Sequence, residues 1–131
     1  MRPAKRLAWG LLALALLAAG CQKLEIEKKV TLDPLEPYRL DIEGPRYEQQ
    51  VTVEIDSPAA PVVAYVVKEE NVEAVLSALD RDKEPTDVLA GTKERSEKVS
   101  LSATIPAKTG YTVLVRSIGK RSEATIRVKG K

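Results

Sequence analysis

The chain has 131 residues, with 21 Lys and Arg against 19 Asp and Glu, and it contains no His. It therefore lacks the side chain best suited to proton transfer near neutral pH, which is also the commonest transition-metal ligand. No Gly-x-Ser-x-Gly turn and no phosphate-binding glycine loop occurs. The composition argues against an enzyme and predicts no cofactor and no catalytic residue.

Residues 1–20 have the three parts of an export signal: a basic start, an apolar run over residues 7–17, and small residues ending at Gly20. Eleven helical residues reach only about 16 Å, which is short of the roughly 30 Å hydrocarbon core of a bilayer. We therefore expect the segment to be removed rather than to remain as a membrane span.

The only cysteine, Cys21, directly follows these small residues. The sequence Leu-Ala-Ala-Gly-Cys over residues 17–21 resembles the lipobox of bacterial lipoproteins, although Ala18 stands where that family usually has Leu. The resemblance implies cleavage between Gly20 and Cys21 and attachment of fatty acyl chains, such as palmitate, to Cys21. It implies a lipid-anchored protein on the extracytoplasmic side of the cell membrane or outer membrane. Gln22, rather than Asp, follows the cysteine, and in lipoproteins sorted by the enterobacterial rule this resembles export to the outer membrane.

Two other interpretations of Cys21 remain open. An unmodified cysteine is often an inert, buried residue, and an odd cysteine in an exported chain can form an intermolecular disulfide. A buried thiol would more naturally lie inside a strand of the folded region than at the end of a leader.

Removal of the leader changes the charge of the chain. The leader carries three basic residues and no acidic ones, so the mature chain has 18 basic against 19 acidic residues. It also loses the single Trp, Trp9, and keeps four tyrosines as its only aromatic residues. A near-neutral chain without clustered stacking aromatics is not expected to bind nucleic acid.

After the leader we predict a lipidated N-terminus and short tether over residues 21–27 and one domain over residues 28–131. Apolar and polar residues alternate repeatedly, as in strands with one face in water. About eight short strands are predicted, over residues 24–32, 38–42, 51–55, 62–67, 88–90, 99–105, 111–115 and 124–128. The run 62–67 is apolar on both faces and is predicted to lie centrally in a sheet.

Turn residues separate these runs. Lys108-Thr109-Gly110 and Ile118-Gly119 are predicted to close two hairpins, which join strand 101–105 to strand 111–115 and strand 111–115 to strand 124–128. Over residues 71–79 the apolar residues have helical spacing, with Asn71 as a candidate cap. We predict a short helix across one end of a sandwich, the alternative being another strand or a loop.

Many short strands at regular spacing predict an all-β protein, a small antiparallel β-sandwich of the jelly-roll kind. Residues 99–115 and 124–128 resemble the closing strands of bacterial pre-peptidase C-terminal domains and related jelly-roll accessory modules. In that family a polar strand leads through a Gly-Tyr turn, here Gly110-Tyr111, into a hydrophobic strand. The resemblance implies an accessory role, and it assigns no calcium ligand in this chain.

Acidic residues are the remaining candidates for chemistry. In the segment 80–84 three acids alternate with Arg81 and Lys83, whose charges oppose a bound calcium ion, so a solvated loop is the expected state. Four tyrosines are candidates for a partner-binding face or, alternatively, for packing in the core: Tyr38, Tyr47, Tyr65 and Tyr111.

The sequence thus predicts a lipid-anchored, non-catalytic binding or accessory module of the bacterial envelope. Its expected partners are the membrane, through Cys21, and an envelope protein or glycan. A small carboxylate-dependent hydrolase and a purely structural envelope spacer are the alternatives.

Overall fold

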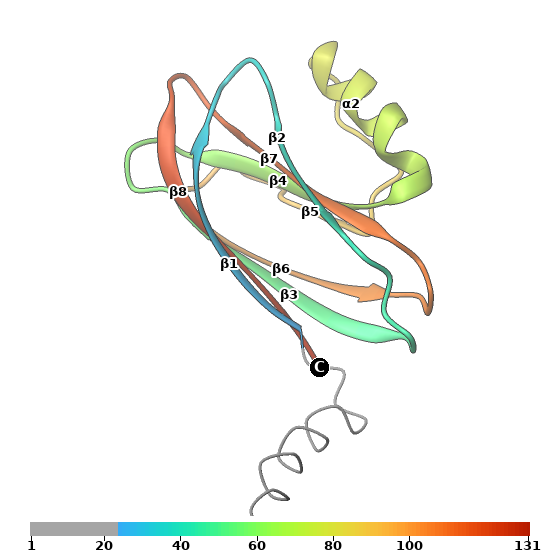
Figure 1. Ribbon diagram of the computed structural model, residues 1–131. Coiled ribbons are helices and arrows are strands. Elements are labelled where there is room, and N and C mark those ends of the chain that lie inside the picture. Colours follow the sequence, from blue (N-terminus) through green and yellow to red (C-terminus); the bar gives the residue numbers. More distant parts are fainter. Residues whose placement is uncertain (1–23) are drawn as a thin grey trace, which may run out of the picture.

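A computed structural model describes residues 24–131 (Figure 1). Cys21 and the predicted leader lie outside the described residues, so the lipobox prediction is not tested by the structure. The described chain contains eight strands and two short helices. The strands are β1 (Leu24–Leu32), β2 (Tyr38–Ile42), β3 (Gln49–Asp56), β4 (Val62–Lys68), β5 (Ala90–Gly91), β6 (Lys98–Ile105), β7 (Tyr111–Ser117) and β8 (Ser122–Gly130). The helices are the 3₁₀ turn η1 (Glu69–Asn71) and α2 (Val72–Asp80).

The strands form two antiparallel sheets packed face to face. The first has the order β1-β8-β3-β6 and the second has the order β2-β7-β4-β5. This is the strand order of a jelly roll, in which consecutive strands repeatedly change sheet. The prediction of a small antiparallel jelly-roll sandwich with one short α-helix is confirmed.

Both predicted hairpins are wrong. Strand β6 pairs with β3, whereas β7 pairs with β2 and β4, so the loop that contains Lys108-Thr109-Gly110 connects two sheets. The next loop, at Ile118-Gly119, likewise passes from β7 in the second sheet to β8 in the first. A turn sequence shows that the chain reverses, but it does not show whether the returning strand lies beside the first one or across the sandwich from it.

Alternation along the strands builds the interior. Every second residue of β3, β6 and β8 is buried, and the residues between them face solvent or are partly exposed. The buried side chains of both sheets meet in one apolar cluster, which includes Leu32, Val53, Ile105, Val113 and Ile126. Since branched aliphatic side chains pack well on pleated surfaces, this composition favours a sheet-on-sheet core.

The second sheet is covered on its other face as well. Helix α2 buries Val72, Val75 and Leu79 in a second apolar cluster with Tyr65 and Leu114 of β4 and β7. This explains why β4 and β7 are apolar on both faces, as predicted for residues 62–67. The helix therefore packs on the outer face of the second sheet and not across one end of the sandwich.

The helix ends in a Schellman motif. Lys83 N–H donates to the Ala78 carbonyl over 2.8 Å, and Asp82 N–H donates to the Leu79 carbonyl over 3.1 Å. Asp82 has a φ of 56°, the left-handed conformation that glycine usually supplies at this position. The N-terminal residue Asn71 makes no side-chain cap hydrogen bond, so its predicted capping role is not seen.

Strand β1 runs from one end of the sandwich to the other (Figure 1). Strand β1 begins at Leu24, within the segment predicted as tether, and pairs along its whole length with β8. Between residues 24 and 131, neither helix has the length and apolar character needed to cross a bilayer.

Candidate functional site

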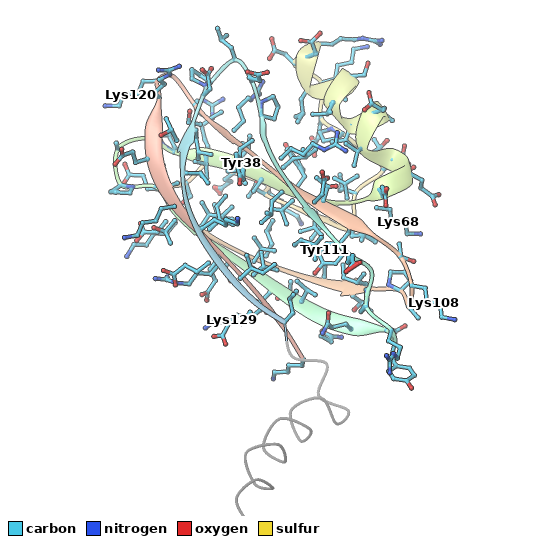
Figure 2. All side chains as sticks on the ribbon, viewed as in Figure 1. Tyr38, Lys68, Lys108, Tyr111, Lys120 and Lys129 are labelled. Atoms are coloured by element: carbon cyan, nitrogen blue, oxygen red, sulfur yellow. The ribbon has the colours of Figure 1, made fainter. Side chains whose placement is uncertain are left out.

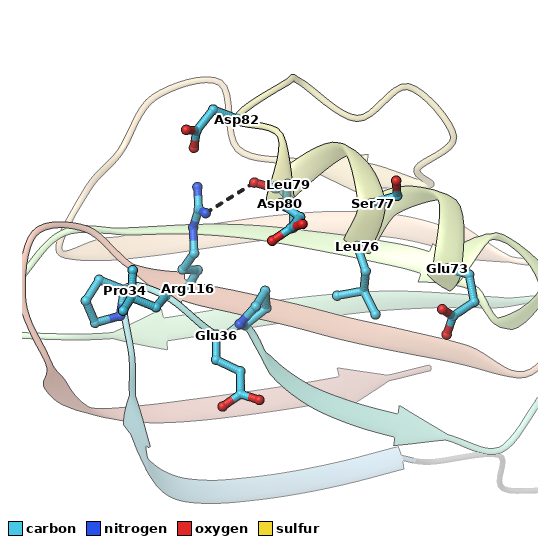
Figure 3. A pocket seen from close by; sticks show the side chains of 11 residues that line it. Pro34, Glu36, Glu73, Leu76, Ser77, Leu79, Asp80, Asp82 and Arg116 are labelled. Atoms are coloured by element: carbon cyan, nitrogen blue, oxygen red, sulfur yellow. Dashed lines mark hydrogen bonds between the residues drawn. The ribbon is translucent and has the colours of Figure 1, made fainter.

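A groove lies at the end of the sandwich opposite to Leu24, between the β1–β2 loop and helix α2 (Figure 3). Its volume is about 890 Å³. Residues 34–37 form one wall, and Glu73, Leu76, Ser77 and Asp80 of α2 form the other. Arg116, near the end of β7, lies between the two walls.

The β1–β2 loop has a fixed shape and presents an apolar side chain. Leu35 N–H donates to Oδ1 of Asp33 over 2.7 Å, which is an Asx turn. Arg121 Nε lies 3.6 Å from the other oxygen of Asp33, and prolines at 34 and 37 restrict the backbone on both sides. Leu35 is nevertheless 89% exposed. The loop thus holds the exposed apolar side chain of Leu35 at the rim of the groove.

Arg116 connects the sheet to the end of the helix. One terminal nitrogen of its guanidinium, Nη1, donates to the Leu79 carbonyl over 3.5 Å, and Nε is buried without a hydrogen-bond partner among the described residues. The carbonyl groups of the last helical turn carry the negative end of the helix dipole, which a guanidinium stabilises. Arg116 therefore helps to hold α2 against β7, and its side chain lies between the β1–β2 loop and the end of the helix (Figure 3).

Four acidic residues line the groove: Glu36, Glu73, Asp80 and Asp82. All four are exposed to solvent, and the side chain of Glu73 is 90% exposed. A catalytic acid of the kind used in glycoside hydrolysis needs an apolar environment that favours its protonated form, and exposure does not supply one. Over residues 24–131, no three side chains of the metal-ligating acidic, Cys or His types come together as a metal site, the segment 80–84 included.

The four candidate tyrosines do not gather on one face. Tyr111 lies between the sheets and is 1% exposed, and burial raises the pKa of its phenol to about 12. Tyr65 is buried beneath α2, where desolvation, and after it the charge of Glu84, raises its pKa. Tyr38 is half-buried and packs against the main core (Figure 2). Only Tyr47, in the β2–β3 loop, is largely exposed, at 64%.

The sequence analysis did not identify Leu35 or Arg116. An apolar residue between two prolines was a usable signal for Leu35, because such a loop is too short and too rigid to fold its side chain back into the core. Nothing in the sequence around Arg116 shows that it meets the end of a helix that comes more than thirty residues earlier in the chain.

Comparison with solved structures finds a similar fold. The chain is similar to the crystal structure of Aeromonas hydrophila PliG, a periplasmic lysozyme inhibitor of g-type lysozyme, with a TM-score of 0.50 and 13% sequence identity. The match covers 86% of this chain and 89% of that one. At this identity the likeness shows a shared fold. No family model matches the chain, and no curated protein is similar to it in sequence.

Proposed function

We propose that the protein is a lipid-anchored, non-catalytic module that binds a protein partner outside the cytoplasm. The anchor is the lipidated Cys21 expected from residues 17–21. A single acyl chain gives only marginal membrane binding, whereas two or three chains make attachment lasting. The domain then needs no membrane-spanning segment of its own.

The direction of β1 supports a role in presenting the groove. Its nine residues make eight steps of about 3.3 Å, so Leu24 and Leu32 lie roughly 26 Å apart. If the tether is at the Leu24 end, the β1–β2 loop and the groove face away from the bilayer. The sandwich would then be a rigid spacer that carries a binding loop at its outer end.

The exposed Leu35 is the observation that carries the proposal. Single exposed apolar residues are common on protein surfaces, but this one is fixed by an Asx turn and two prolines beside a groove. A preorganised loop loses little conformational entropy on binding, which favours affinity. The surrounding carboxylates add a preference for a partner with a basic surface.

The similarity to PliG supports a protein partner in general, because that protein is named as an inhibitor of another protein. Lysozymes are therefore the first partners to test. A glycan partner lacks a comparable observation, since the exposed Tyr47 is in the β2–β3 loop and does not line the groove.

A photo-crosslinking amino acid at position 35 tests the proposed site in living cells. We expect a discrete adduct with one envelope protein, and no such adduct from the exposed Ser102 on β6, which is the matched control position. In parallel, the soluble Cys21→Ser protein is assayed against g-type and other lysozymes. Leu35→Asp is expected to weaken binding of the captured partner about tenfold or more, or roughly 1.4 kcal/mol. Equal crosslinking from both positions would refute the groove as the binding site.

A carboxylate-dependent hydrolase is the second candidate, because four acids line the same groove. It is the weaker of the two, since all four side chains are exposed to solvent. It predicts release of soluble fragments from peptidoglycan or other envelope polymers by the purified domain. It further predicts loss of that activity in Asp80→Asn or Glu73→Gln while binding of the polymer is retained.

A further inference from the structure

At the end of the sandwich opposite the groove lie the start of β1, the β2–β3 loop and the β6–β7 loop. Leu24 pairs with Gly130 of β8, and the backbone N–H of Lys131 donates to the Gln50 carbonyl over 3.1 Å. The side chain of Gln49 packs so closely on Gly130 that a Cβ at Gly130 would lie 2.7 Å from it. The first residues of β1 and β3 are therefore joined through the end of β8.

The β2–β3 loop, residues 43–48, is fixed at this end. The backbone N–H of Lys108, in the β6–β7 loop, donates to the Pro45 carbonyl over 2.6 Å. Gly44 lies against the same loop, and a Cβ there would come within 2.6 Å of the Thr109 backbone nitrogen. This loop carries Tyr47, so the backbone beside its exposed ring is held in place.

We propose that this end of the domain rests on the bilayer surface and that Tyr47 enters the headgroup region. The inference rests on the proposed lipidation of Cys21. Three peptide steps separate Cys21 from Leu24, so their Cα atoms are at most about 11 Å apart. The headgroup region of one leaflet is roughly 5 to 7 Å thick. Such a short connection keeps the whole end of the sandwich within reach of the headgroups.

Tyr47 is close enough to this attachment point to take part. It lies three residues before Gln50, which hydrogen bonds to Lys131, so its Cα is within about 11 Å of Gln50 along the chain. Tyrosine is enriched at membrane interfaces because its ring is apolar and its hydroxyl group is polar. The ring adds several ångströms to the reach of the loop.

Basic and acidic side chains offset each other at this end, so the ring of Tyr47 is the main group that would contact the bilayer. Lys129 lies opposite Glu25 in the register of β1 and β8, and Arg46 lies between Glu43 and Glu48 in the sequence of its loop. Figure 2 shows Lys108 and Lys129 toward this end and Lys120 at the opposite one. Because basic and acidic groups alternate, a general attraction to anionic lipid is weak. A bilayer brought close by acyl chains is the occupant that this end fits.

A single tryptophan provides the test, because the one natural Trp, Trp9, lies in the predicted leader. Lipidated Tyr47→Trp protein is reconstituted in vesicles of zwitterionic and anionic phospholipids, with and without brominated acyl chains. We expect the emission to shift to shorter wavelength and to be quenched about twofold or more by the brominated lipids. Leu35→Trp, at the far end, is the matched control and is expected to keep the emission of an exposed residue.

The outcomes separate this inference from the proposed anchor. Flotation of the vesicles and the mass of the N-terminal peptide report whether the protein is lipidated and attached. If it is attached and Tyr47→Trp behaves like Leu35→Trp, the contact of this end with the bilayer is refuted while the anchor stands. If the protein neither floats nor carries acyl chains, the anchor itself fails. Circular dichroism of both variants confirms that each exposed substitution leaves the β-sandwich folded.

Discussion

Tyr111 provides a test of the packing between the two sheets. Its side chain is 1% exposed and its hydroxyl group has no hydrogen-bond partner among the described residues. A buried polar group without a partner costs about 1 to 3 kcal/mol relative to a satisfied one. Tyr111→Phe removes only that hydroxyl and leaves the ring in place. We therefore expect the variant to be more stable than the parent by about 1 kcal/mol or more at neutral pH.

The same substitution changes the alkaline limit of stability. Burial raises the pKa of Tyr111 to about 12, above the ordinary tyrosine value of about 10 that applies to the unfolded chain. Between these two values the unfolded chain loses the phenolic proton while the folded chain retains it, so stability falls as the pH rises. A difference of about two units corresponds to roughly 2 to 3 kcal/mol. This loss is absent from Tyr111→Phe, so its advantage over the parent grows between about pH 10 and pH 12.

Urea unfolding of the soluble Cys21→Ser domain at neutral and alkaline pH measures both effects as changes in the free energy of unfolding. In thermal unfolding, a gain of 1 kcal/mol raises the melting temperature of a domain of this size by roughly 4 to 8 °C. Tyr47→Phe is the matched control for removal of a tyrosine hydroxyl group, because the side chain of Tyr47 is largely exposed and not buried between the sheets. A Tyr111→Phe variant less stable than the parent by 1 kcal/mol at neutral pH would contradict the reasoning, because the hydroxyl must then have a partner.

Three further expectations concern single positions. Asp82→Gly relieves the left-handed backbone at the end of α2 and is expected to stabilise the domain by about 0.5 to 1 kcal/mol in urea unfolding, whereas Asp82→Ala brings no gain. The Thr112 hydroxyl group donates to Asp41 over 2.7 Å and lowers the pKa of that carboxyl group. Stability from this contact is present above the ordinary value of 3.8 and is lost as the pH falls below it, so Thr112→Val is expected to destabilise at neutral pH by an amount that shrinks in acid. Cys21→Ala is expected to abolish membrane fractionation, and recovery of the variant in a salt-washed membrane pellet would count against the tether.

Much of the fold follows from local sequence patterns. Alternation with a period of two assigns the residues of β3, β6 and β8 to their inner and outer faces, and the run 62–67 shows that a strand is covered on both sides. The helical spacing after residue 71 predicts α2 within a residue or two of its observed bounds. These assignments succeed because each side chain's burial depends on the repeat of its own element.

Strand pairing and the groove depend on contacts between distant residues. The periodicity of β7 does not show that it lies between β2 and β4, nor that α2 provides the cover for its outer face. The exposure of Leu35 and the contact of Arg116 with Leu79 arise only when the β1–β2 loop, the helix end and β7 meet at one end of the sandwich. The sequence by itself therefore determined which elements form and which faces they bury. The tertiary structure alone decided which elements are neighbours, because that choice minimises the exposed apolar area of the whole domain and is not encoded in any one segment.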